Sequence, residues 1–370
     1  MRTTRREFLK LSAGVAGAAA CGAFGIGCDA RANETRPGKT LLPPAGAAEF
    51  ETRGVVLVPD DFSLSDWPER AVRAGLTTLA IHHAVSPQAV VKFAESEKGQ
   101  DALNRCRRLG LRVEYELHAI KELLPRDLFA KDQSLFRMDE KGGRVADSNA
   151  CVHSSRALDI IAENAVRLAA KLKPTTGRHF YWGDDGAPWC RCPQCRGLSD
   201  SEQALIVENH VVAALRRADR GATLAHLAYH NTLKPPLQVK PHPAVFLEYA
   251  PIHRSYDVPY ADQTGAEARD GLPALEANLK VFPSSTAQVL EYWLDVSRFS
   301  QWQRPAKKLP WNRAVFISDL RTYAARGIRN VTTFAVWIDA EYVKAFGEPA
   351  FIAEYGNGFS QAADKLKRRA

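Results

Sequence analysis

Short hydrophobic runs alternate along the chain with longer segments in which hydrophobic positions recur every three or four residues. The short runs are typical of buried β-strands, and the longer segments are typical of helices that pack one face on a core. Strands are predicted at residues 55–58, 77–82, 112–117, 179–182, 223–229, 245–249, 288–292 and 331–337. The strand-then-helix order predicts an α/β fold with a mostly parallel sheet.

Helical patterns separate most of these strands. Helices are predicted at residues 67–74, 87–109, 155–172, 201–218, 272–281 and 312–325. Ser199 or Asp200 is available to cap the helix that begins near residue 201. Eight strands in this order predict a single-domain (β/α)8 TIM barrel over residues 51–360. A dinucleotide-binding sheet is the alternative, but no predicted strand is followed by a Gly-x-Gly-x-x-Gly loop.

The N-terminus has the features of a twin-arginine export signal. Arg5 and Arg6 precede a weakly hydrophobic segment rich in Ala and Gly, and small residues precede a cleavage position after Ala32. Residues 1–32 are therefore predicted to be a signal peptide, with the twin-arginine translocase as export partner. The mature protein is expected to be periplasmic or extracellular. The minority alternative is a lipoprotein, with the lipid on Cys21 or Cys28.

Residues 33–50 are rich in Pro, Gly and Ala and are predicted to form a flexible leader. Removal of residues 1–32 takes away five basic and two acidic residues, so the formal net charge falls from +8 to +5. The basic residues are interspersed with acidic ones, which argues against nucleic-acid binding and at most favours an anionic substrate. No segment reaches the ~18 apolar residues that span a bilayer, so no membrane span is expected.

Polar and aromatic residues stand where the predicted strands end. In a TIM barrel these ends surround one mouth, where the chemistry takes place. For any single residue a structural role is about as expected as a functional one, but the complete ring favours a site. Aromatic faces stack on sugar rings while polar groups bind hydroxyls, so a carbohydrate is the predicted ligand. The candidate substrate-binding residues are Asp184, His83, His118, Trp182, His230, Asn231, Tyr249, Tyr292 and Trp337.

Cleavage of a glycosidic bond commonly requires two carboxyl groups, one protonated and one ionised. Asp185, after the fourth strand, is the candidate acid, because the charge of Asp184 beside it would raise its pKa. Glu291, after the seventh strand, is the favoured second carboxylate, by analogy with barrel glycosidases. Glu248, after the sixth strand, is the competing candidate.

A cysteine cluster follows the candidate acid. Three sulfurs in one short segment suit tetrahedral zinc if Cys151 or a nearby histidine supplies a fourth ligand. A disulfide, for example from Cys151 to one of the three, is the default for an exported protein and stays an equal alternative. Either would hold the loop beside Asp185, and no cofactor is expected to be required for catalysis. The clustered residues are Cys190, Cys192 and Cys195.

Several of these features resemble the bacterial family called domain of unknown function 4838. The similar features are residues 129–136, Gly143-Arg144, Asn149-Ala150-Cys151, Asp185-Gly186 with the cysteine cluster, Asn209, Ala228-Tyr229 and Glu291-Tyr292-Trp293. The resemblance covers roughly residues 55–339. It implies a barrel and a carbohydrate-related activity of the α-glucuronidase and β-hexosaminidase kind. The β-hexosaminidase pattern has Asp-Glu where this chain has Asp184-Asp185, which argues against a substrate-assisted mechanism on N-acetyl sugars.

These features together predict an exported enzyme that hydrolyses O-glycosidic bonds of a polysaccharide or oligosaccharide. Two alternatives stay open. One is a carbohydrate-binding barrel protein without turnover. The other is a metal-dependent hydrolase that uses His82, His83 and nearby carboxylates, although the chain has no His-Glu-x-x-His motif.

Overall fold

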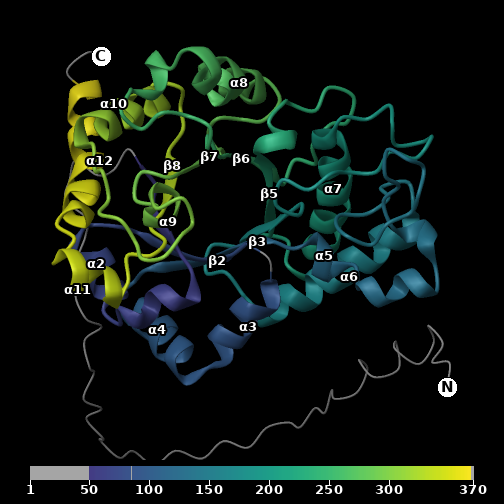
Figure 1. Cartoon of the computed structure of the whole chain (residues 1–370), viewed down its shortest axis with the longest axis horizontal. Helices are drawn as coiled ribbons and strands as arrows, with labels where there is room; N and C mark the ends of the chain where they lie inside the picture. Colours follow the sequence, from purple (N-terminus) through teal and green to yellow (C-terminus); the bar gives the residue numbers. More distant parts are fainter. Residues whose placement is uncertain (1–49, 85, 368–370) are drawn as a thin grey trace, which may run out of the picture. The chain divides into compact units, whose positions relative to one another are not determined.

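The computed structural model describes residues 50–84 and 86–367. The predicted signal peptide, the leader up to residue 49 and the alternative lipidation sites Cys21 and Cys28 lie outside these residues. Eight parallel strands pair in sequence order and close into a barrel, in which β1 pairs with both β2 and β8 (Figure 1). The strands are β1 (Thr52–Leu57), β2 (Thr78–His83), β3 (Arg112–His118), β4 (Arg178–Trp182), β5 (Thr223–Ala228), β6 (Val245–Tyr249), β7 (Gln288–Glu291) and β8 (Asn330–Phe334). The predicted (β/α)8 TIM barrel is confirmed.

Helices connect the strands and surround the barrel (Figure 1). Of the two predicted capping residues, it is Ser199 that caps α7. Its hydroxyl accepts a hydrogen bond from the backbone N–H of Glu202. The α-helices are α2 (Trp67–Arg73), α3 (Pro87–Glu95), α4 (Glu97–Arg108), α5 (Ile120–Leu123), α6 (Ser155–Lys171), α7 (Asp200–Ala218), α8 (Leu272–Leu279), α9 (Val296–Phe299), α10 (Arg313–Ala324), α11 (Ala340–Phe346) and α12 (Phe351–Lys367).

The single helix predicted at residues 87–109 is in fact two helices. The break is at Ser96, whose backbone is extended and whose hydroxyl accepts a hydrogen bond from the backbone N–H of Gly99. Ser96 therefore ends α3 and caps α4. Polar residues that compete for backbone hydrogen bonds in this way favour helix starts over helix interiors.

The sequence pattern did not indicate α12, because Gly356 and Gly358 lower its helix propensity. The structure shows why both are glycine. A Cβ atom at Gly356 would lie 1.7 Å from the backbone oxygen of Ala74, and one at Gly358 would lie 2.2 Å from the ring of Phe316. The two glycines thus allow α12 to pack closely against α2 and α10.

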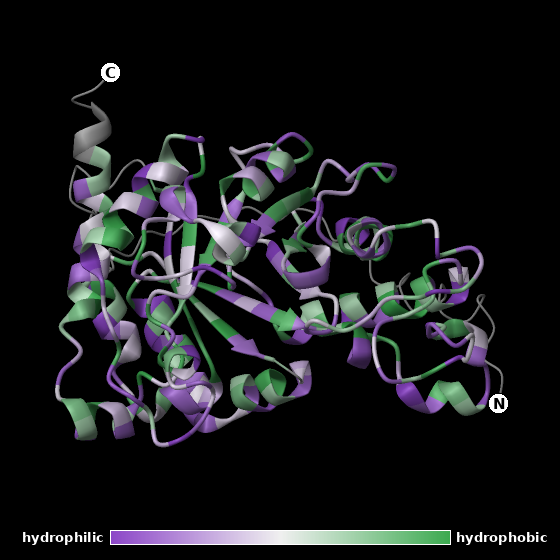
Figure 2. Cartoon of the chain, turned by 45° about the horizontal axis from the view of Figure 1, so that its top comes forward, coloured by the Kyte–Doolittle hydropathy of each residue, from purple (hydrophilic) through white to green (hydrophobic). Residues whose placement is uncertain are grey.

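The barrel interior contains polar side chains from several strands. Gln288 Nε2 donates to Glu248 Oε1 at 2.9 Å and lies 3.4 Å from Glu116 Oε1, so β7, β6 and β3 are linked across the interior. Trp182 Nε1 donates to Glu248 Oε2 at 2.8 Å. Burial raises the pKa of Glu248 to about 8 and that of Glu116 well above its usual value. Figure 2 shows hydrophilic segments on the strands beside the hydrophobic ones.

Two long loops lie together at one side of the barrel mouth. The first joins β3 to α6 (residues 119–154), and the second joins β4 to α7 (residues 183–199). The backbone N–H of Arg191 donates to the backbone oxygen of Met138 at 2.9 Å, which ties the loops together. No helix among residues 50–84 and 86–367 is long and apolar enough to cross a membrane.

Candidate active site

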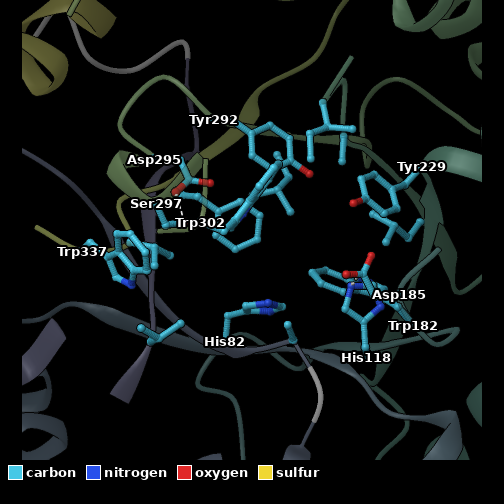
Figure 3. A pocket seen from close by; sticks show the side chains of 18 residues that line it. His82, His118, Trp182, Asp185, Tyr229, Tyr292, Asp295, Ser297, Trp302 and Trp337 are labelled. Carbon is cyan, nitrogen blue, oxygen red and sulfur yellow. Dashed lines mark hydrogen bonds and ion pairs between the residues drawn. The ribbon is translucent and has the colours of Figure 1, made fainter. Parts of the chain in front are cut away.

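A cavity of about 300 Å³ lies at the barrel mouth, and every strand contributes to it at or just beyond its carboxyl end (Figure 3). Its wall is mostly aromatic and aliphatic, with two carboxyl groups and two imidazoles among the polar groups. Such a composition is typical of a binding site for a small molecule. The lining residues are Val58, His82, Ala84, His118, Trp182, Asp185, Leu227, Tyr229, Ala250, Ile252, Leu290, Tyr292, Asp295, Ser297, Trp302, Phe334, Val336 and Trp337.

Asp185 lies at the edge of this cavity, and its side chain is 46% exposed. Its Oδ1 atom is 3.8 Å from Nε2 of His118. Burial raises the pKa of Tyr229, and the charge of Asp185 raises it further, so the phenol keeps its proton. Asp185 is therefore a carboxyl group that solvent and a ligand can reach, with His118 close beside it.

Two histidines form part of the cavity wall with their Nδ1 atoms turned away from it. Nδ1 of His118 lies 2.6 Å from the backbone oxygen of Gly183, and Nδ1 of His82 lies 2.7 Å from that of Glu116. A carbonyl oxygen only accepts, so each Nδ1 carries a proton. Burial, and secondly the nearby His118, lower the pKa of His82 to about 3. The neutral His82 ring therefore has a hydrogen-bond acceptor at Nε2.

The second carboxyl group in the cavity is Asp295, which the sequence reasoning did not identify. It follows β7 and caps α9, where its Oδ1 accepts hydrogen bonds from Ser297 Oγ at 2.6 Å and from the backbone N–H of Arg298 at 3.1 Å. Burial raises the pKa of Asp295 to about 6. Figure 3 shows Asp295 and Ser297 on one side of the cavity and Asp185 with His118 on the other.

The carboxylates expected as partners of Asp185 lie elsewhere. Glu291 is fully buried outside the cavity, where Arg254 Nη1 lies 2.8 Å from its Oε1, Tyr256 donates to its Oε2, and Tyr323 also donates to it. Glu248 is fully buried within the barrel and accepts the hydrogen bonds from Trp182 and Gln288 described above. Neither lines the cavity. In β7 it is Leu290 that faces the cavity, and successive side chains of a strand alternate in direction.

The other predicted residues divide into two groups. Trp182, Tyr292 and Trp337 line the cavity with His118. Asp184 does not: its Oδ2 accepts a hydrogen bond from the backbone N–H of Asn149 at 2.6 Å and its Oδ1 from that of Lys121 at 2.9 Å.

His83, Asn231 and Tyr249 also lie outside the cavity. His83 Nδ1 accepts from the backbone N–H of Ser86, Asn231 donates to the backbone oxygen of Ala187, and the hydroxyl of Tyr249 donates to the backbone oxygen of Asp270. Asn231 thus joins the loop after β5 to the loop after β4, whereas the contacts of His83 and Tyr249 each lie within one strand–helix connection.

A second cavity of about 570 Å³ adjoins the first and contains His230. Nδ1 of His230 lies 3.0 Å from Nε2 of His253, and Arg298 adds a positive charge to the wall. Both cavities share Asp185, Tyr229, Ile252 and Trp302. Trp302 is 64% exposed. Asp185 therefore stands at the junction of a smaller aromatic cavity and a larger, more polar one.

The sequence profile of a domain of unknown function family, DUF4838, matches residues 52–333 of the chain. The chain belongs to this family. No curated protein matches this DUF4838 chain.

Solved structures similar to the DUF4838 chain include β-galactosidase Gan42B from G. stearothermophilus, at 13% identity and a TM-score of 0.52, over 85% of this chain and 57% of that one. Others are a β-galactosidase from Marinomonas ef1 (13% identity, TM-score 0.49, 85% and 59% coverage) and a β-N-acetylhexosaminidase from Bacteroides fragilis (10%, 0.48, 83% and 65%). The chain thus matches less than two thirds of each of these proteins. At this identity, the likeness to Gan42B shows a common barrel fold.

The predicted metal ligands of the DUF4838 chain are brought together. The Sγ atoms of Cys151, Cys190, Cys192 and Cys195 all lie within 4.8 Å of one another, and all four residues are buried. The cysteines among the described residues are free, so the disulfide that was the equal alternative to zinc is not present there. His82 and His83 point to opposite sides of β2 and, within the described part of the chain, belong to no such cluster.

Proposed function

We propose that this protein hydrolyses O-glycosidic bonds with Asp185 and Asp295 as its pair of carboxyl groups. The observation that carries the proposal is that both face one aromatic cavity at the carboxyl ends of the barrel strands, where TIM-barrel enzymes have their active sites. Most glycosidases use such a pair, with one carboxyl group on either side of the scissile bond. Asp295 takes the place that the sequence reasoning gave to Glu291.

The two carboxyl groups have different roles in this proposal. The glycosidic oxygen joins two sugar units, so the acid that protonates it belongs between their binding sites. Asp185 lines both cavities and fits that role. Asp295 lines only the smaller cavity and would face the sugar ring there, either as nucleophile or as base for water.

Sugar recognition follows from the groups around the two acids. Trp182, Tyr292 and Trp337 provide aromatic faces and edges in the smaller cavity, and the free Nε2 of His82 can accept a bond from a hydroxyl. The guanidinium of Arg298 in the larger cavity supports an anionic sugar beyond the cleaved bond. The proposed substrate is an oligosaccharide or polysaccharide that contains acidic sugars.

The test is a screen of the protein lacking residues 1–32 on uronic-acid and amino-sugar glycans, with reducing-sugar release as the readout. Asp185→Asn and Asp295→Asn are each expected to lower kcat by about 10²–10⁴-fold while ligand binding is kept. Asp257→Asn, at an exposed carboxylate outside both cavities, is the matched control.

Two results would contradict the proposal. Full activity in both variants would exclude these carboxylates as the catalytic pair. Glycan binding by the wild type with no release of reducing sugar from any glycan would instead support the carbohydrate-binding barrel without turnover.

We also propose that residues 1–32 direct export through the twin-arginine translocase. The support is the Arg5-Arg6 pair before a weakly hydrophobic segment. Replacing both arginines by lysine is expected to keep the protein in the cytoplasmic fraction, whereas the unchanged sequence delivers it to the periplasm or medium. Equal export of both forms would overturn this assignment.

A further inference from the structure

Four buried cysteines, which line neither cavity, meet where the β3–α6 loop contacts the β4–α7 loop that carries Asp185. Cys151 comes from the β3–α6 loop, and the other three come from the β4–α7 loop. The Sγ atom of Cys151 lies 3.9 Å from that of Cys192 and 3.9 Å from that of Cys195. Two separate loops must be held in fixed positions to bring four buried thiols together.

The spacing of the sulfurs distinguishes the two explanations that the sequence left open. A disulfide requires an S–S distance of about 2.0 Å, roughly half of what is found between Cys151 and its two neighbours. Four sulfurs at about 2.3 Å from a central zinc ion form a tetrahedron with edges of about 3.8 Å. The 3.9 Å separations agree with the tetrahedron.

The groups around the sulfurs suit thiolates. The backbone N–H of Met138 donates to Cys190 Sγ at 3.3 Å, and Nη1 of Arg144 lies 3.8 Å from the same atom. Nδ1 of His153 lies 3.2 Å from Cys195 Sγ. Zinc with four thiolates carries two negative charges, so N–H donors and a nearby guanidinium stabilise it.

We infer that Cys151, Cys190, Cys192 and Cys195 bind one zinc ion. With four protein ligands the ion has no open position for water or substrate, so its role is structural. Because the ligands come from both long loops, the ion joins the β3–α6 loop to the β4–α7 loop at a fixed distance.

The same two loops also meet at Asn149, two residues before Cys151. The side chain of Asn149 accepts from the backbone N–H of Asp184 at 2.9 Å and donates to the backbone oxygens of Ala187 and Pro188 at 3.2 and 3.1 Å. Asn149 thus holds the segment that contains Asp185. The zinc ion anchors both ends of this contact, through Cys151 on one loop and Cys190 on the other.

The test is elemental analysis of the protein purified without chelators, which needs no substrate and so is independent of the proposed glycosidase activity. About one zinc ion per chain is expected. Cys192→Ser is expected to lose the ion. The matched control is Cys106→Ser, at a buried thiol outside the cluster, which is expected to keep it.

A milder variant keeps the test valid if Cys192→Ser does not fold. His153→Ala removes only the group beside Cys195 and is expected to weaken zinc binding by about 10–100-fold in a chelator competition. Unchanged affinity would remove His153 from the site.

The loop contact is tested by limited proteolysis. Removal of zinc is expected to expose residues 119–154 and 183–199 to cleavage, and added zinc is expected to restore protection. Three results would each overturn the inference. They are a metal-free protein with four reactive thiols, two disulfides found by mass spectrometry, and bound iron in place of zinc. An unchanged cleavage pattern in the metal-free protein would overturn the role of the ion in holding the loops.

Discussion

Nε2 of His118 lies 3.8 Å from Oδ1 of Asp185, and Nδ1 of the same ring donates to the backbone oxygen of Gly183, two residues before Asp185. The loop that carries the carboxylate thus also fixes the orientation of its neighbouring ring. A small movement on substrate binding would bring Nε2 and Oδ1 within hydrogen-bonding distance, where they can share one proton.

His118→Asn is expected to lower kcat/KM by about tenfold or more, equivalent to ~1.4 kcal/mol. The reason is that the substitution removes the imidazole whose Nε2 lies beside Asp185. His83→Asn is the control, because the His83 side chain points to the opposite side of β2 from that of His82 and lies outside the cavity. Equal losses in both variants would show that His118 is only structural.

The pH dependence of activity is expected to report Asp295. Burial raises its pKa to about 6, and the proposed role needs its ionised form. The activity is therefore expected to increase as the pH rises through about 6 and to fall below that pH as Asp295 takes up a proton. The measurement is kcat/KM on an uncharged aryl glycoside between about pH 4 and 9.

Circular dichroism over the same pH range separates this effect from unfolding. An activity that keeps rising below pH ~5 in the folded protein would contradict an ionised Asp295 and would exchange the roles of the two carboxyl groups.

The buried ion cluster around Arg254 is expected to contribute to stability. Arg254 Nη1 and Nη2 each lie 2.8 Å from a carboxylate oxygen, of Glu291 and Asp319 respectively, and all three side chains are fully buried. Arg254→Met leaves two buried carboxylates without their cation and is expected to lower the free energy of unfolding by about 3–5 kcal/mol in urea. Arg167→Met, which breaks an exposed pair with Glu163, is expected to change it by about 0.5 kcal/mol or less.

The sign of the pH effect provides a further check on this variant. Burial raises the pKa of Asp319 to about 7 even with Arg254 present, compared with about 3.9 in an unfolded chain. A carboxyl group whose pKa is higher in the folded than in the unfolded protein lowers the free energy of unfolding at a pH above its folded-state pKa. This loss disappears as the pH falls toward the unfolded-state pKa. Arg254 lowers this pKa, so its loss raises the pKa further, and the deficit of Arg254→Met is expected to shrink as the pH falls toward about 7. A deficit that grows on acidification would contradict this explanation.

The fold could be predicted from the sequence because each strand is a short hydrophobic run and each long helix has a 3.6-residue period. The misassignments involve features that such periods do not capture. Ser96 interrupts an otherwise continuous helical pattern, and α5 and α9 have only four residues each.

The candidate site was harder to predict, because knowing that a residue is at a strand end does not tell whether its side chain points into the cavity. Alternation along β7 could have shown that Leu290 and Glu291 face opposite sides, but not which one faces inward. Asp295 had a local signal, since Asp is one of the residues preferred at the N-cap of a helix. Trp302 had none, because it reaches the cavity from an irregular loop.

Trp302 is expected to bind substrate without taking part in catalysis. The residue is 64% exposed and lines both cavities, so its ring can stack on a sugar at their junction. Trp302→Ala is expected to weaken substrate binding by about 0.5–1.5 kcal/mol, or roughly tenfold at most, with little change in kcat. An exposed side chain contributes little to packing, so the melting temperature should stay the same.

Leu237→Ala, at an 85% exposed leucine outside both cavities, is the control for loss of surface hydrophobicity. If Trp302→Ala lowers kcat with unchanged KM, the residue acts on the reacting groups and its stacking role is wrong.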